Sequence, residues 1–166
     1  MPSSSPIDAT DAQLLLALTR HPRATAIALA EQVGLARNTV HTRLARLEQR
    51  GALGSFENRI DPSALGYPLT AFVTAQVNQH GLDDVATALS DIPEVLQVHG
   101  LSGPTDLLIH VVAADTDDLY RIAGQILAIP DVERTNTSLA MRQLVDYRIT
   151  PLLQRITGPS AAQQNA

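Results

Sequence analysis

The chain has 166 residues, 45% of them hydrophobic and 17% charged, with a net charge of -5. It is long and apolar enough to bury a core in one domain or two small ones, so it is not a disordered chain. The lack of cysteine excludes disulfides and thiolate chemistry, and no apolar run approaches the roughly 18 residues of a membrane span.

The charge is divided unevenly along the chain. Residues 1–60 hold seven arginines and five acidic residues, a balance of +2. Residues 61–166 hold five arginines and twelve acidic residues, a balance of -7. Every basic side chain is an arginine, which suits contacts to phosphates and base edges. We therefore expect the two halves to have different partners.

The N-terminus lacks a cationic start followed by an apolar run, so we expect no secretory signal, a cytoplasmic location and no membrane partner.

Two short helices are predicted next. Thr10, with Gln13 three residues later, forms a capping box for the first helix. The second helix follows a break at Pro22, is capped by Thr25 and ends at Gly34. The positions predicted to face inward are Leu14, Leu15, Leu18, Ile27, Leu29, Ala30 and Val33.

A third helix is predicted from about Arg37 to Gln49. Val40, Leu44 and Leu47 recur at i, i+4 and i+7, which indicates one buried stripe, and Gly51 ends the helix. A helix, a short turn containing glycine and a second helix form the helix-turn-helix pattern. The following stretch, ALGSFENRIDP, has short strand-like pieces around a polar turn, which indicates a wing hairpin.

The third helix is the candidate DNA-reading element. In helix-turn-helix proteins the N-terminal part of the second helix reads base edges, through pairs such as asparagine with adenine and arginine with guanine. The side chains expected near bases are Arg37, Asn38, Thr39, His41 and Thr42, and those expected to face phosphates are Arg43, Arg46, Arg50 and the wing residue Arg59. The alternative is an ordinary solvated helix that its arginines keep soluble.

The second half of the chain has a different pattern. Residues 61–68 are punctuated by Pro62, Gly66 and Pro68 and are predicted to be a linker. Beyond them, alternating strand-like and helical segments follow in the order βαββαβ, ending in the strand DVERTNTSLAMRQLV. This is the ferredoxin-like order, and the echo of DIPEV (91–95) in AIPDV (128–132) supports two βα halves.

The expected fold class is therefore α+β, with a winged helix-turn-helix followed by a ferredoxin-like domain. The expected boundaries are residues 1–60 for the winged helix-turn-helix, 61–68 for the linker, 69–157 for the ferredoxin-like domain, and 158–166 for a disordered tail.

The segment LLIHVVA predicts a strand that is apolar on both faces. Leu107, Ile109 and Val111 point one way, and Leu108, His110 and Val112 point the other. Two helices cover only one face of a four-stranded sheet, so the second face must be buried elsewhere. A second copy of the same sheet is the economical cover, and we expect a homodimer.

The connection between the second and third strands is a candidate small-molecule site. Gly103, Pro104, Thr105 and Asp106 form a turn in which backbone groups could approach a ligand, although a plain hairpin turn is the alternative. His99 and His110 could face each other on paired strands, but no third ligand stands at metal-like spacing. We expect no catalytic residues, no metal site and no cofactor.

Several separated motifs together resemble the Lrp/AsnC (feast/famine) transcription regulators. These motifs are ATDAQLLLALTRHPRATAIALAEQVGLARNTVHTRLARLEQRGALGSF, then DPSALGY, then IPEVLQVHGLSGPTDLLIHV and IPDVERTNTSL. The resemblance covers roughly residues 7–150, in order. It implies a winged helix-turn-helix that binds double-stranded DNA, joined by a hinge to a ferredoxin-like sensing domain.

The resemblance also implies sheet-mediated dimers that assemble into tetramers, octamers or larger discs. A small effector, typically an amino acid, would bind near the Gly-x-x-Asp turn, which puts Gly103, Pro104, Thr105 and Asp106 at the effector site. Thr135 and Thr137, in the strand after Asp131, are further candidates. The family usually has serine as the N-cap of its recognition helix, where this chain has Ala36, so Asn38 or Thr39 could cap a helix that starts later.

Two other functions remain open from the sequence. Sirohaem decarboxylases resemble the same two-domain architecture, and His110 sits in a comparable LLIHV context, but their aromatic-rich signature is missing. The other alternative is a metabolite-binding protein whose helix-turn-helix no longer binds DNA.

Overall fold

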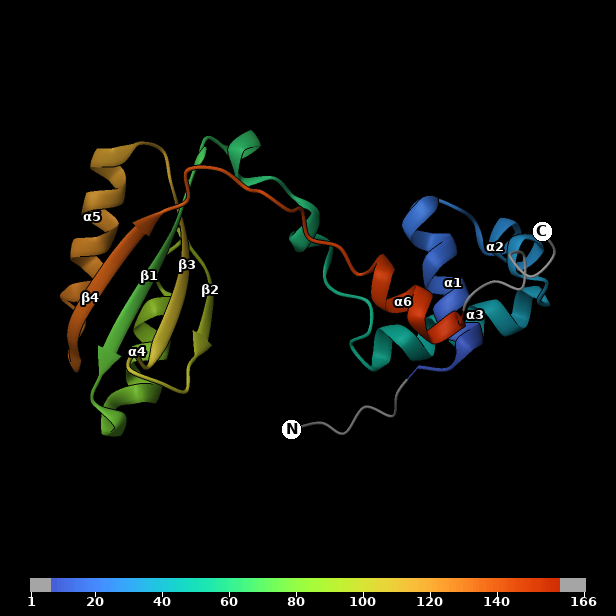
Figure 1. The fold of residues 1–166 in the computed structure, drawn as a ribbon, viewed down its shortest axis with the longest axis horizontal. Helices are drawn as coiled ribbons and strands as arrows, with labels where there is room; N and C mark the ends of the chain where they lie inside the picture. The colour runs from blue at the N-terminus through green and yellow to red at the C-terminus, as the bar shows by residue number, and fades with distance from the viewer. Residues whose placement is uncertain (1–6, 159–166) are drawn as a thin grey trace, which may run out of the picture. The chain divides into compact units, whose positions relative to one another are not determined.

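The computed structural model describes residues 7–158, which divide into two units (Figure 1). The first unit combines the described residues up to Asn58 with those from Val145 onward, and the second is Arg59–Leu144. Each unit has its own cluster of buried apolar side chains. The tail predicted to be disordered lies, apart from Gly158, outside the described residues.

Three helices build the N-terminal part of the first unit: α1 (Ala9–Arg20), α2 (Ala26–Val33) and α3 (Arg37–Gln49). The side chains predicted to face inward from the three helices pack together, and Leu14, Leu29, Val40 and Leu47 are fully buried. Ile27 is the exception: it was expected to face inward, but it is 51% exposed.

The predicted capping box at Thr10 is wrong. Helix α1 begins at Ala9, and its N-cap is Asp8, whose Oδ1 accepts a hydrogen bond of 2.7 Å from the backbone N–H of Asp11. Thr10 therefore lies inside the first turn, because the stronger aspartate cap starts the helix two residues earlier. Thr25 caps α2 as expected, accepting from the N–H of Ala28, and Gly34 ends α2 in the left-handed conformation.

A short helix near the C-terminus, α6 (Thr150–Thr157), completes this unit. It lies beside α1, and its Leu153 is buried in the same core as the first three helices (Figure 1). The predicted sensing domain extends to residue 157, but these last residues pack on the helix-turn-helix. The exclusion of Leu153 from water is the physical reason for this boundary.

The predicted wing hairpin is absent from the described residues. The segment holds two short 3-10 helices, Phe56–Arg59 and Pro62–Leu65, in place of strands. Asp61 caps the second of these helices by accepting a hydrogen bond of 3.0 Å from the N–H of Ser63, and Pro62 is the first residue of that helix. A proline there has no N–H to give to a strand ladder, which favours the helical turn.

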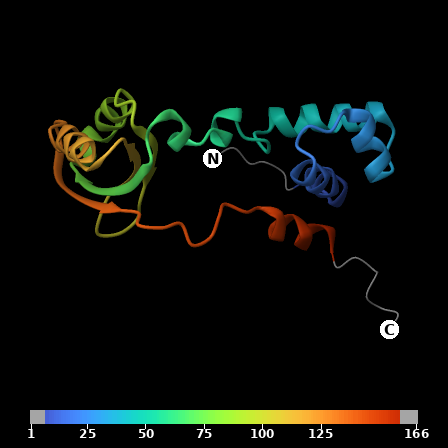
Figure 2. The same cartoon turned by 90° about the horizontal axis from the view of Figure 1, so that it is seen from above.

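The second unit has the predicted βαββαβ order. Its elements are β1 (Leu69–Val77), α4 (Leu82–Ser90), β2 (Val95–Gly100), β3 (Leu107–Ala113), α5 (Thr116–Leu127) and β4 (Val132–Leu139). The strand order is β2-β3-β1-β4 and all neighbours are antiparallel. Both helices cover the same face of the sheet (Figure 2). The fourth strand ends at Leu139, so the strand predicted for that region is shorter than expected.

The other face of the sheet is partly apolar, as the alternation in β3 predicts. Leu107, Ile109 and Val111 are buried against the helices, whereas His110 points to the opposite face. There the ring of His110 stacks on that of Phe72, with centroids 5.0 Å apart, and Phe72 remains 40% exposed. Within residues 7–158, no helix is long and apolar enough to cross a membrane.

Candidate DNA-binding and effector sites

The recognition helix begins at Arg37. Ala36 occupies the N-cap position with extended backbone and makes no side-chain capping bond. Asn38 and Thr39 therefore lie in the first turn of α3, and neither of them caps a later start. At the other end, Gly51 has φ +69° and its N–H donates to the carbonyl of Glu48, which closes the helix as predicted.

The N-terminal half of α3 presents polar side chains to solvent. Arg37, Asn38, Thr39, His41 and Thr42 are all exposed, whereas Val40 between them is fully buried. The hydroxyl of Thr42 donates to the carbonyl of Asn38 at 2.9 Å, so its oxygen keeps acceptor capacity only. The five side chains predicted to lie near bases thus share one accessible stretch of helix.

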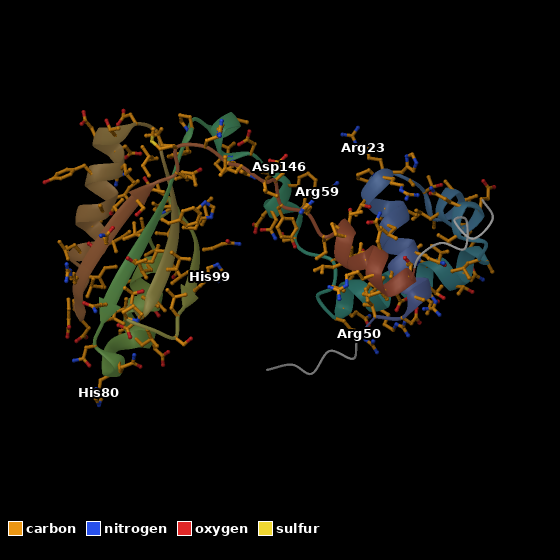
Figure 3. All side chains as sticks on the ribbon, viewed as in Figure 1. Arg23, Arg50, Arg59, His80, His99 and Asp146 are labelled. Carbon is orange, nitrogen blue, oxygen red and sulfur yellow. The ribbon has the colours of Figure 1, made fainter. Side chains whose placement is uncertain are left out.

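The four arginines predicted to contact phosphates lie in different surroundings. Arg50 directly follows α3 and is exposed (Figure 3). Arg59 is also exposed, but it lies at the start of the second unit, outside the unit that carries α3. Arg43 and Arg46 are only partly exposed, because their guanidinium groups turn back toward α1.

Arg43 and Arg46 form ion pairs with the first turn of α1. Asp11 is 2% exposed, and its two carboxylate oxygens accept from Arg43 Nη1 at 2.6 Å and from Arg46 Nη2 at 2.7 Å. Arg43 Nη1 also donates to Asp8 Oδ2 at 2.7 Å. The hydrogen bond from Arg43, together with the one from the N–H of Asp11, holds the pKa of Asp8 below its usual value, while the two carboxylates raise the pKa of Arg43.

These contacts change the roles expected of Arg43 and Arg46. A buried carboxylate must be compensated by partners, and Asp11 has these two arginines as its cationic partners. The Nε of Arg46 is itself buried with no hydrogen-bond partner in the described structure, although 41% of the side chain is exposed. We therefore assign both arginines to holding α3 against α1, a role that the sequence does not predict, while their phosphate contacts stay a prediction.

The Gly103–Asp106 turn is held by hydrogen bonds at the end of the sheet. Gly103 has φ +147°, a conformation that side chains disfavour. Asp106 Oδ2 accepts from the N–H of Val77 and Oδ1 from Gln79 Nε2, both at 2.9 Å. The carbonyl of Pro104 accepts from Gln76 Nε2 at 2.8 Å. Sequence reasoning missed the two glutamines, because their roles depend on how β1 ends against this turn.

The remaining candidates lie on the sheet. Thr135 and Thr137 pair with Ala75 and Val73 of β1, so they share the helix-covered face, with Thr135 half-buried and Thr137 exposed. His99, exposed on β2, pairs with Leu108 and shares the other face with His110 (Figure 3). Burial, and then the charge of His99, lower the pKa of His110. No group of three metal-binding side chains occurs within residues 7–158.

Comparison with known proteins agrees with both units. Residues 7–48 match the AsnC-type helix-turn-helix domain, and residues 70–150 match the Lrp/AsnC ligand binding domain. The HTH-type transcriptional regulator AldR of Mycolicibacterium smegmatis is 36% identical over 142 residues, which cover 83% of each chain. The chain belongs to the Lrp/AsnC family of transcriptional regulators.

Solved structures support the same fold. AsnC of E. coli has a TM-score of 0.78 at 23% identity, with 89% of this chain and 100% of that chain covered. The leucine response regulatory protein LrpA of Mycobacterium tuberculosis has a TM-score of 0.74 at 28% identity, with 86% and 98% covered. The protein is thus a DNA-binding transcription regulator with a ligand-binding domain, and its relatives carry the names of regulators, which favours this function over the enzyme alternative.

Proposed function

We propose that the chain binds specific double-stranded DNA sites through the exposed first two turns of α3 and responds to an amino acid through its ferredoxin-like domain. The observation that carries the DNA half is the exposure of Arg37, Asn38, Thr39, His41 and Thr42 around the buried Val40. These residue types match the base-edge chemistry of the major groove, and Arg50 supplies a phosphate contact at the end of the helix. Arg59 is a further candidate phosphate contact.

The effector is proposed to bind at the Gly103–Asp106 turn. Hydrogen bonds order this turn before any ligand arrives, which lowers the entropy cost of binding. The Asp106 carboxylate suits the ammonium group of an amino acid, and the exposed peptide groups of the turn suit its carboxylate. Thr135 and Thr137 are proposed as secondary contacts. The name of the M. tuberculosis relative, a leucine response protein, agrees with this effector class.

Assembly is proposed to couple the two halves. The partly apolar face around Phe72 and His110 would be covered by the same face of a second copy, giving a homodimer that assembles further into a tetramer or octamer. Binding of an effector between dimers would favour one assembly over another. The spacing of the helix-turn-helix units would then change, and with it the half-sites that can be occupied together.

The test measures three quantities: the binding of each amino acid, the mass of the protein assembly and the affinity for DNA. Each amino acid is titrated by calorimetry, and those that bind are added during light scattering and during binding to the DNA upstream of the protein's own gene. We expect at least one amino acid to change both the mass and the affinity, and Asp106→Ala to abolish both changes while leaving effector-free DNA binding intact. If every amino acid that binds leaves mass and affinity unchanged, the effector proposal is wrong.

A further inference from the structure

The ion pairs between α1 and α3 divide into a buried and an exposed part. Asp11 is buried, so its bonds to Arg43 and Arg46 lie mostly out of water. The side chain of Asp8 is 50% exposed, and its bond to the same Arg43 Nη1 lies at the surface. Surface ion pairs contribute little to stability, whereas removing one partner of a buried pair is strongly destabilising. The bond to Asp8 is therefore the weaker one.

Arg43 is the arginine of the pair that bonds to Asp8: its Nη1 lies 2.7 Å from Asp8 Oδ2, whereas Arg46 Nη2 lies 4.0 Å from the same oxygen. The Nε of Arg46 is buried without a partner, whereas no nitrogen of Arg43 is buried and unsatisfied in the described structure. Arg43 belongs to the same helix as the exposed base-reading side chains and lies four residues, about one turn, after Thr39, so these two share a face of α3. A guanidinium group has five N–H donors, so Arg43 has the capacity to keep Asp11 while it exchanges Asp8 for another anion.

We infer that Asp8 competes with DNA phosphate for Arg43 and so sets the DNA affinity of the recognition helix below what its arginines would give. Asp11 is the fixed anchor that keeps α3 in place, and Asp8 is the exchangeable partner that neutralises Arg43 at the surface. The inference rests on the proposed use of α3 in DNA binding. It goes beyond that proposal because it assigns an affinity-lowering role to a residue outside the helix-turn-helix motif.

The two oxygens of Asp8 have separate tasks, and this separation gives a clean variant. Oδ1 caps α1 by accepting from the N–H of Asp11, while Oδ2 accepts from Arg43. Asparagine is as good an N-cap as aspartate. Asp8→Asn therefore keeps an oxygen for the cap and removes the charge that holds Arg43, so the fold of α1 is expected to be retained.

The experiment measures binding of the full-length protein to a labelled, mixed-sequence DNA duplex as a function of salt, because the phosphate contribution does not depend on sequence. We expect Asp8→Asn to bind more tightly and to steepen the salt dependence by about one phosphate contact, a slope change of about 0.9. The gain in affinity should then shrink about threefold as salt rises from about 50 to about 200 mM. In the Asp8→Asn background, Arg43→Gln should abolish the gain.

Glu48→Gln is the matched control, because it removes one negative charge from α3 itself. Within residues 7–158, Glu48 makes no ion pair through its side chain. If Asp8→Asn changes the slope no more than Glu48→Gln does, or if the gain persists after Arg43→Gln, the effect is general electrostatics and the competition is refuted. If the parent protein binds no duplex while its helices remain folded, the proposed function and this inference both fail.

Discussion

Asp11→Asn tests most sharply how α1 and α3 are held together. The substitution keeps the volume of the side chain but removes the charge that Arg43 and Arg46 share, at 2.6 and 2.7 Å. Loss of one partner from a fully buried ion pair costs about 3–5 kcal/mol. The side chains of Arg43 and Arg46 are 25% and 41% exposed, so water compensates them in part. We therefore expect the free energy of unfolding of the helix-turn-helix unit to fall by about 2–3 kcal/mol.

The assay is urea denaturation of the full-length chain, followed by far-UV circular dichroism. Two units with separate cores are expected to unfold in separate transitions, so the transition of the sheet unit is an internal reference. Asp117→Asn, at an exposed position in the first turn of α5, is the matched control. A change below about 0.5 kcal/mol, which is typical of surface substitutions, would refute the structural role of Asp11.

Four further predictions concern the two units. Arg50→Ala should weaken binding to all duplexes and reduce the salt slope by about 0.9, and an unchanged slope would exclude a phosphate contact. Burial lowers the pKa of His110 in the folded chain, so as pH falls the unfolded chain takes up a proton at this histidine first. The sheet unit should therefore lose stability below about pH 6.5, the usual pKa of histidine. A melting temperature that depends on pH equally in His110→Gln would contradict this. Gly81→Ala should destabilise the same unit by about 1–3 kcal/mol, because the new Cβ would overlap the Asp131 carboxylate. Asp131→Gly removes that carboxylate and relieves the strain of a side chain at φ +67°, so it should restore much of the loss in the double variant. Equal destabilisation of the single and double variants would show that the overlap is not the cause.

Local periodicity predicts most of the fold. The alternation in LLIHVVA gives the two faces of β3, and the spacing of Val40, Leu44 and Leu47 gives the buried stripe of α3, because both patterns follow directly from backbone geometry. Caps are harder to predict where two patterns compete. Asp8 and Thr10 both precede a polar residue three positions later, and the structure selects Asp8.

Contacts between residues far apart in the sequence cannot be predicted from local patterns. The arginines of α3 appear solvent-exposed by local pattern, yet Arg43 meets acids 32 and 35 residues earlier. One signal was present: two acids spaced i, i+3 on α1 match two arginines spaced i, i+3 on α3. The role of α6 was equally concealed, because nothing local indicates that a short helix after the sheet returns to pack on α1.

Footprinting on the DNA upstream of the protein's own gene tests the central claim most directly. We expect protection of half-sites one or more helical turns apart, lost in Asn38→Ala and retained in Arg46→Lys, with a pattern that changes when an effector amino acid is added. Absence of protection by the folded protein, with and without every amino acid, would contradict the claim that α3 reads DNA.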